Sequence, residues 1–136
     1  MAVGLERRLL QGAVALGCAV PLAAGAVGIV HGPAMLHGVA EAVTPDLDSH
    51  FRYLSGLLLA VGIGFASCIP AIERKTGRFR LLALLVFIGG LGRLLSLLAA
   101  GEPGPGHIFG LAMELGVVPL LVLWQARLAA KEAPGR

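Results

Sequence analysis

Long apolar stretches separated by polar segments dominate the sequence. Four of them are long enough to cross the hydrocarbon core of a bilayer, which takes about 20 predominantly apolar residues in a helix. They run from about Leu9 to Val30, Tyr53 to Ile72, Leu81 to Ala100 and His107 to Ala126. Backbone polar groups inside a bilayer must be hydrogen-bonded within the spanning segment. The pattern therefore predicts an all-α fold, with residues 1–136 forming a single domain built as a four-helix transmembrane bundle.

The connections between these stretches differ in length. Residues 73–78 form a short polar turn, and residues 101–106 form a second turn that is rich in Gly and Pro. Such turns predict antiparallel neighbours, so the third and fourth spans should form a hairpin. The first connection, residues 31–52, is longer, and its 33–43 part is compatible with a short helix lying in the membrane interface.

Basic residues gather at one side of the predicted bundle. Lys and Arg are in excess on the cytoplasmic side of bacterial membrane proteins. The opposite side holds Arg52 alone, and Arg93 lies within the third span. We therefore expect both termini to lie in the cytoplasm, the 31–52 loop to face outward, and the protein to lie in the inner (plasma) membrane. The basic set comprises Arg7, Arg8, Arg74, Lys75, Arg78, Arg80, Arg127, Lys131 and Arg136.

The first span has an alternative interpretation. Arg7 and Arg8, the apolar run and the Ala23–Ala26 cluster together resemble a secretory signal with a small-residue cleavage site. The apolar run continues to Val30, which is longer than a signal core requires. We expect this helix to be retained, with cleavage as the alternative.

Composition narrows the possible partners. The chain is 57% hydrophobic and 14% charged, whereas soluble domains carry about 25% charged residues. A water-soluble globule is thereby excluded, and membrane lipids become the expected partners. The formal charge of +3 could suggest nucleic acid, but no basic stripe with interleaved aromatics is present, so no nucleic-acid partner is expected. A homo-oligomer or another membrane protein remains possible.

Small residues recur along the spans at spacings typical of closely packed membrane helices. A small residue or proline stands at every fourth position along parts of the first two spans, and the third span carries small and polar residues on one face. Pro21, Pro70 and Pro119 should each produce a mild kink, because proline leaves a carbonyl without its helical donor. The three sets are Ala13, Gly17, Pro21 and Gly25; Gly56, Ala60, Gly64 and Cys68; and Gly89, Gly92, Arg93 and Ser96.

Arg93 and Glu114 are ionisable residues placed deep in the predicted membrane segments. Arg93 is eight residues before Gly101, and Glu114 is eight residues after Gly106. Both should lie about 12 Å below the same end of the hairpin. Because a charge exposed to lipid costs roughly 3 kcal/mol, an ion pair between them is expected. The pair could fix the register of the hairpin, or it could mark a ligand pocket, a proton path or a catalytic acid.

Further polar residues lie at the outer side. Asp48, His50 and Arg52 precede the second span and are close enough in sequence to cap a cavity leading to Arg93 and Ser96. The candidate polar site is therefore Arg93, Glu114, Arg52, Asp48, His50 and Ser96. Histidines at the outer side could hold a metal ion, but their spacing matches no zinc pattern, so we expect no metal and no cofactor. These weak metal candidates are His31, His37, His50 and His107.

Short motifs between Ser49 and Gln125 resemble a known family. Phe51–Gly56 (FRYLSG), Gly89–Ser96 (GGLGRLLS) and Met113–Leu115 (MEL) are similar to segments of the domain of unknown function 4345 family. The resemblance implies four membrane helices in a bacterial protein and draws attention to Arg52, Arg93 and Glu114. It implies no activity.

Three hypotheses for function follow. The first is a non-catalytic bundle that binds a lipid or apolar molecule, or associates with a partner, and it requires only the small-residue faces and the Arg93–Glu114 pair. The second is a proton or ion transport element, although a chain of four short helices lacks the inverted repeats typical of transporters. The third is an enzyme acting on a lipid or quinone-like substrate with Glu114 as the acid–base group. We favour the non-catalytic hypothesis.

Overall fold

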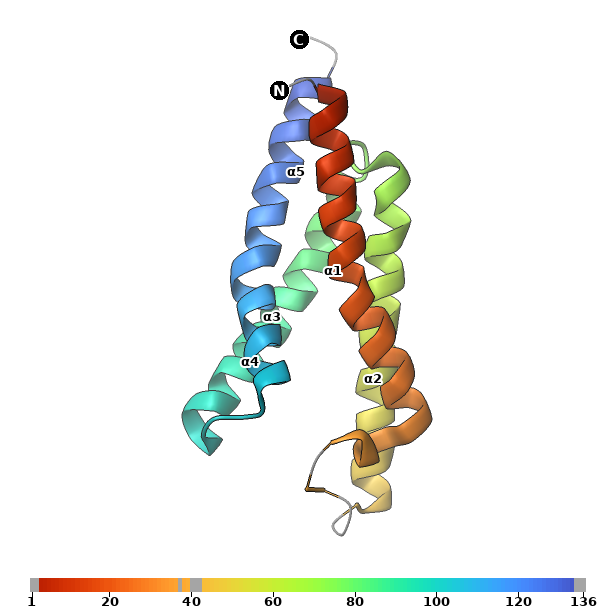
Figure 1. Ribbon diagram of the computed structural model, residues 1–136, viewed down its shortest axis with the longest axis vertical. Coiled ribbons are helices and arrows are strands. Elements are labelled where there is room, and N and C mark those ends of the chain that lie inside the picture. Colours follow the sequence, from red (N-terminus) through yellow and green to blue (C-terminus); the bar gives the residue numbers. More distant parts are fainter. Residues whose placement is uncertain (1–2, 37, 40–42, 134–136) are drawn as a thin grey trace. The chain divides into compact units, whose positions relative to one another are not determined.

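The computed structural model describes residues 3–36, 38–39 and 43–133, and helices make up most of this part of the chain (Figure 1). Two short 3₁₀ segments, η1 and η2, follow the first two long helices. The last long helical segment is continuous but changes type, from α4 through the π-helical turn η3 to α5. The elements are α1 (Val3–His31), η1 (Gly32–Met35), α2 (Pro45–Cys68), η2 (Ile69–Ala71), α3 (Thr76–Ala100), α4 (Pro105–Ala112), η3 (Met113–Val117) and α5 (Val118–Glu132).

Within the described residues, four helical segments are long and apolar enough to cross a membrane. They are Val3–Met35, Pro45–Ala71, Thr76–Ala100 and Pro105–Glu132. The all-α, four-helix membrane fold predicted from the sequence is thereby confirmed. Large apolar side chains are exposed along these helices, for example Leu16 at 78% and Leu98 at 77%. Such exposure is expected where hydrocarbon rather than water is the solvent.

The helices extend beyond the predicted spans. The clearest case is α2, which begins at Pro45 rather than near Tyr53, so the first connection is shorter than the predicted 31–52 loop. Thr44 caps this helix: its Oγ1 accepts a hydrogen bond of 3.2 Å from the Leu47 N–H, as expected for a threonine N-cap. Proline is favoured in the first turn that follows such a cap. Of the interfacial helix considered for residues 33–43, η1 covers the beginning, and residues 37 and 40–42 lie outside the described residues.

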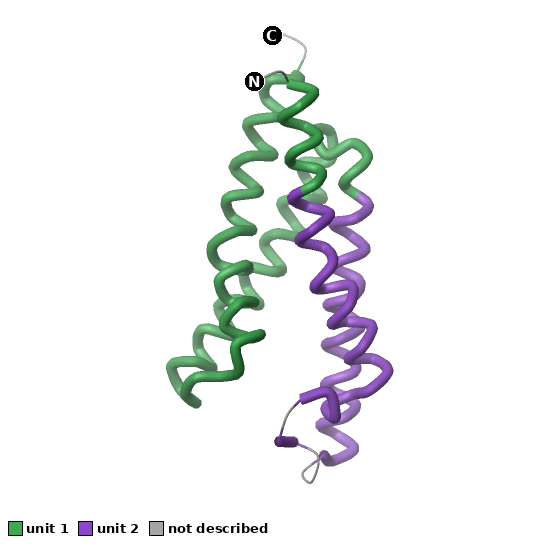
Figure 2. The backbone as a smooth tube through the Cα atoms, viewed as in Figure 1, with its two compact units in different colours: residues 1–12, 68–136 green, residues 13–67 purple. Residues whose placement is uncertain are grey.

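The chain divides into two compact units (Figure 2). Unit 1 comprises residues 1–12 and 68–136, and unit 2 comprises residues 13–67. The second half of α1 and most of α2 form unit 2. The beginning of α1 joins α3, α4, η3 and α5 in unit 1.

In unit 2, α1 and α2 approach closely at glycines. A Cβ atom added to Gly25 would lie 2.6 Å from the backbone N of Leu59, and one added to Gly62 would lie 3.1 Å from the Leu22 side chain. In contrast, a Cβ at Gly17 or Gly56 would meet nothing within 4 Å. The predicted packing faces are therefore wrong at Gly17 and Gly56. A spacing of four rotates about 40° per step around a helix of 3.6 residues per turn, so its members do not share one face.

In unit 1, the described core lies near the beginning of α3 and the end of α5. Gln125 is completely buried there, and its Nε2 donates hydrogen bonds of 2.8 Å to the Ile72 carbonyl and to Thr76 Oγ1. These bonds fix α5 to the turn that precedes α3. The largest apolar side chains buried beside this polar contact are Leu10, Ile72, Phe79 and Leu128.

The three prolines differ in effect. Helix α1 continues through Pro21, whereas at Pro70 the helix tightens into the 3₁₀ segment η2. Pro119 follows directly after the π-helical turn η3. A π-turn inside a membrane helix lets the chain re-satisfy backbone groups that a proline leaves without a donor.

Candidate functional site

The expected ion pair between α3 and the fourth spanning segment is present. Arg93 Nε lies 2.9 Å from Glu114 Oε2, and Arg93 Nη2 lies 3.0 Å from Glu114 Oε1. Two parallel N–H···O bonds of this kind are the strongest arrangement available to arginine and a carboxylate. The side chains are 32% and 17% exposed, so the pair is largely screened from its surroundings.

Two glycines make room for this pair. A Cβ at Gly90 would lie 2.9 Å from the Cβ of Glu114, so α3 and η3 are in close contact there. On the facing side, a Cβ at Gly110 would lie 3.5 Å from Cζ of Arg93. The guanidinium therefore lies directly against the backbone of α4. A larger residue at Gly90 would push α3 and η3 apart, whereas a methyl group at Gly110 would only be in ordinary contact with the guanidinium.

Glu114 also depends on the π-helical turn. It is the second residue of η3, where the helix is wider by one residue per turn than an α-helix. Because π-turns shift the direction of the residues in and after them, η3 sets where the Glu114 carboxylate points. Such turns occur often at functional sites, and the residues of this one carry no sequence pattern that predicts it.

His107 is a second hydrogen-bond partner of Arg93, beside Glu114. Its Nδ1 lies 2.8 Å from Arg93 Nη1. A guanidinium can only donate hydrogen bonds, so Nδ1 must accept, and the neutral imidazole then carries its proton on Nε2. His107 was considered only as a weak metal candidate. The depth argument missed it because His107 lies near the turn, within reach of the long arginine side chain but not at the same level.

A hollow of about 360 Å³ adjoins these residues; we call it the Arg93 hollow. It is lined by Gly89, Arg93, Ser96, Pro103 and His107. Ser96, predicted on the same face as Arg93, therefore lies beside it. Arginine has five N–H donors, and the contacts with Glu114 and His107 engage three of them. The remaining N–H groups, the Ser96 hydroxyl and the His107 ring are donors available to a molecule in this hollow.

Arg52 and Asp48 form a separate contact in unit 2. Arg52 Nε lies 2.8 Å from Asp48 Oδ2. Its Nη1 donates to the carbonyl of Val30 at 3.0 Å and also to that of Ile29. These are carbonyls at the end of α1, which lack partners within the helix. Arg52 therefore caps α1. His50 is exposed, and a shared cavity between these residues and Arg93 stays a prediction.

Removing this cap should destabilise unit 2 moderately. We expect Arg52→Ala to lower the free energy of unfolding by about 1 kcal/mol, because it removes charge-assisted hydrogen bonds from a partly exposed site. Denaturation of the purified protein in detergent micelles would measure the change. His50→Ala, two residues earlier on the same helix, is the control and should leave stability unchanged. Equal stability of both variants would show that the cap contributes nothing.

A second group of charges, at the beginning of α1 and the end of α5, was not predicted. Glu6 is buried, with its side chain 4% exposed, and the side chain of Glu73, in the turn before α3, is 7% exposed. Lys131 Nζ lies 2.5 Å from Glu6 Oε2. Arg7 contacts two carboxylates: its Nη2 lies 2.6 Å from Glu132 Oε2, and its Nε lies 3.5 Å from Glu73 Oε2. The predicted first span started at about Leu9, so Arg7 was expected outside it, and Glu6 was not considered. The helix in fact begins at Val3.

The histidines do not gather around a common point in the part of the chain that the structure describes. No group of three or more His, Cys, Asp or Glu side chains there could hold a metal ion. His31, His50 and His107 are exposed, and His37 lies outside the described residues. His107 contacts Arg93 rather than a carboxylate or a second histidine.

Comparison with known proteins identifies the family and leaves the activity open. No curated protein and no solved structure matches the chain. The profile of a family described as a domain of unknown function, DUF4345, matches residues 9–125. The matched region contains Arg52, Arg93, His107 and Glu114, together with most of all four spanning segments. The chain therefore belongs to the DUF4345 family of proteins of unknown function.

Proposed function

We propose that this membrane protein binds an apolar or lipid-like molecule whose polar head carries a hydrogen-bond-accepting oxygen, and that it does so in the Arg93 hollow. One observation carries the proposal. A guanidinium held on two sides by Glu114 and His107 retains N–H groups beside a hollow of about 360 Å³. An N–H group facing hydrocarbon without an acceptor is costly. A ligand oxygen would satisfy it.

The charge balance favours an uncharged head group. Arg93 is neutralised by Glu114 at 2.9 Å, and His107 accepts from Arg93, which requires an unprotonated Nδ1. The lining therefore offers donors without a surplus positive charge. Carbonyl or hydroxyl oxygens suit such a site, whereas a phosphate would need a counter-charge that the pair no longer supplies.

The same geometry gives less support to the alternatives. As an acid–base group for a lipid or quinone-like substrate, Glu114 would need an oxygen within reach of the substrate, but Glu114 does not line the Arg93 hollow, and both of its oxygens are directed to Arg93. A transport element would need a path for ions through the helices. Association with a second copy or another membrane protein is compatible with ligand binding. We also propose that both termini are cytoplasmic, on the basis of the lysine and arginine excess, and that the protein lies in the bacterial inner membrane, as the family resemblance implies.

Mass spectrometry of the purified protein tests the proposal. We expect one apolar species to co-purify in near-stoichiometric amount, beyond the bulk lipid. His107→Ala should lower its apparent affinity about three- to tenfold, because the loss of one hydrogen-bonding group costs about 1 kcal/mol. His50→Ala, which also removes an exposed histidine, should retain the co-purifying species with unchanged affinity.

Two results would contradict this proposal. Recovery of bulk lipid alone, from both the native protein and the two variants, would argue against a specific ligand. Equal retention of one species by His107→Ala and the native protein would place its binding site elsewhere.

A further inference from the structure

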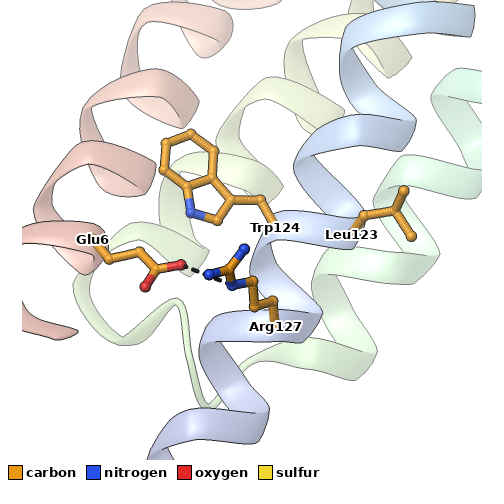
Figure 3. A pocket seen from close by; sticks show the side chains of 4 residues that line it. All are labelled: Glu6, Leu123, Trp124 and Arg127. Carbon is orange, nitrogen blue, oxygen red and sulfur yellow. Dashed lines mark ion pairs between the residues drawn. The ribbon is translucent and has the colours of Figure 1, made fainter. Parts of the chain in front are cut away.

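A second hollow, of about 410 Å³, lies at the opposite end of unit 1 from the α3–α4 turn. It is lined by Glu6 from α1 and by Leu123, Trp124 and Arg127 from α5 (Figure 3); we call it the basic-end hollow. None of these residues belongs to the Arg93 hollow. Its lining combines two charged residues with one apolar and one aromatic residue, a combination that suits an amphipathic molecule.

The charges around this hollow do not cancel. The buried carboxylate of Glu6 faces two cations: Lys131 Nζ lies 2.5 Å from Oε2, and Arg127 Nε lies 3.6 Å from Oε1. Glu6 alone therefore cannot neutralise both cations, whereas the neighbouring Arg7 is paired with two carboxylates, Glu73 and Glu132, so the positive excess is local to Arg127 and Lys131. The closer contact belongs to Lys131, and that of Arg127 is longer than a hydrogen bond.

Arg127 carries the accessible part of this surplus. Its side chain is 71% exposed, and its ion-pair contact with Glu6, 3.6 Å from Nε to Oε1, is longer than a hydrogen bond, so the guanidinium is not held by a hydrogen bond to this carboxylate. A planar guanidinium edge with two N–H groups matches the oxygens of a phosphate. An ion pair this exposed adds little to stability, which leaves the side chain able to turn toward a ligand.

The position of the hollow indicates where such a phosphate comes from. Arg127 and Glu6 lie within the last and first two turns of their helices, at the depth where a spanning segment passes from hydrocarbon to headgroups. Trp124 is an amphipathic residue typical of that level. The neighbouring Leu123 is 67% exposed and offers an apolar surface for an acyl chain.

We propose that the basic-end hollow binds the phosphate headgroup of an anionic membrane lipid, with Arg127 contacting the phosphate and Trp124 and Leu123 contacting the glycerol and upper acyl chain. The surplus charge favours an anionic headgroup over a zwitterionic one, in which the ammonium would cancel the attraction. This site differs in residues and in chemistry from the ligand site proposed at Arg93, so either can fail without the other.

Trp124 makes the site directly measurable, because it is the one tryptophan in the sequence. The full chain is reconstituted in phosphatidylcholine vesicles containing a small fraction of phosphatidylglycerol brominated on its acyl chains, and quenching of Trp124 fluorescence is recorded. Brominated phosphatidylcholine at the same fraction is the reference. From the electrostatic attraction of one basic residue near the surface, we expect phosphatidylglycerol to bind about fivefold more tightly at Trp124.

Two variants locate this preference. Arg127→Gln should abolish it, so that both brominated lipids quench equally. Arg8→Gln removes an exposed positive charge from the same end of unit 1 without touching the hollow, and it should retain the preference. Because Arg127 is mostly exposed, its replacement should leave the fold intact, which circular dichroism would check.

The outcomes that overturn the proposal are equally definite. Equal quenching by both lipids in the native protein would exclude an anionic lipid site. Equal reduction of the preference by Arg8→Gln and Arg127→Gln would show general surface attraction rather than a site. Millimolar inorganic phosphate should leave Trp124 emission in pure phosphatidylcholine unchanged; a change that Arg127→Gln removes would assign the hollow to a soluble phosphate instead.

Discussion

Glu114→Leu should lower the free energy of unfolding by about 3 kcal/mol, because it leaves the Arg93 guanidinium without a counter-charge in an apolar environment. Arginine cannot lose its proton to escape this cost. His107 accepts one bond from Arg93 but supplies no negative charge. The change is measured by titrating the purified protein in mixed micelles with a denaturing detergent and following Trp124 fluorescence.

The reverse substitution should be milder. In Arg93→Leu, the isolated carboxyl group can take up a proton and become neutral, so we expect about half of the loss seen for Glu114→Leu. The double variant, with leucine at both positions, should recover most of the stability, since replacing a whole buried ion pair by apolar residues is often close to neutral. Equal losses in the two single variants, without recovery in the double variant, would contradict this account of the pair.

The charge swap Arg93→Glu with Glu114→Arg separates pairing from binding. It retains an ion pair at the same depth but reverses which helix presents the guanidinium to the Arg93 hollow. Stability should largely return, whereas the co-purifying ligand should be lost. Loss of both would mean that the local environment accepts the pair in one orientation only.

Gly25→Ala should also have a large effect, in the other unit. The added methyl group would lie 2.6 Å from the backbone N and 2.9 Å from the Cα of Leu59. Backbone atoms cannot turn aside as a side chain can, so α1 and α2 would have to separate. Overpacking of this kind costs about 1–3 kcal/mol, and we expect about 2 kcal/mol here, measured as for Glu114→Leu.

Gly17→Ala is the matched control, because it makes the same chemical change on the same helix. A Cβ there meets nothing within 4 Å. Alanine is the better helix former by about 1 kcal/mol, so this variant should be as stable as the native protein or more so. If both glycine variants behaved alike, the close approach of α1 to α2 at Gly25 would be refuted.

The features predicted correctly from sequence depend on the bilayer rather than on side-chain detail. Hydrocarbon thickness fixes the length of the spans, so four helices followed from apolar runs alone. The Arg93–Glu114 contact followed from counting residues on each side of the 101–106 turn. Both predictions depend only on how deep a residue lies in the membrane, and that depth follows from counting residues along the sequence.

The features that were missed depend on rotation about the helix axis. Gly25 packs against Leu59 while Gly17 does not, although both fitted a spacing of four. The π-turn at Met113–Val117 changes the direction in which side chains near Glu114 point around the helix axis. The nearby Pro119 was the one sequence signal of an irregular helix there. Glu6 is buried because polar residues at a helix end continue the helix past the apolar run, and hydropathy gives no signal of that continuation.

The contacts of Glu6 also bear on the order in which this protein can assemble. Its partner Lys131 is 125 residues away in the sequence, so α1 is synthesised and inserted long before the cation that neutralises its buried carboxylate leaves the ribosome. Until then, Glu6 must be solvated by water or headgroups at the membrane surface. The ion pair that joins the first turns of α1 to the last turns of α5 therefore forms late, only after α5 has been synthesised.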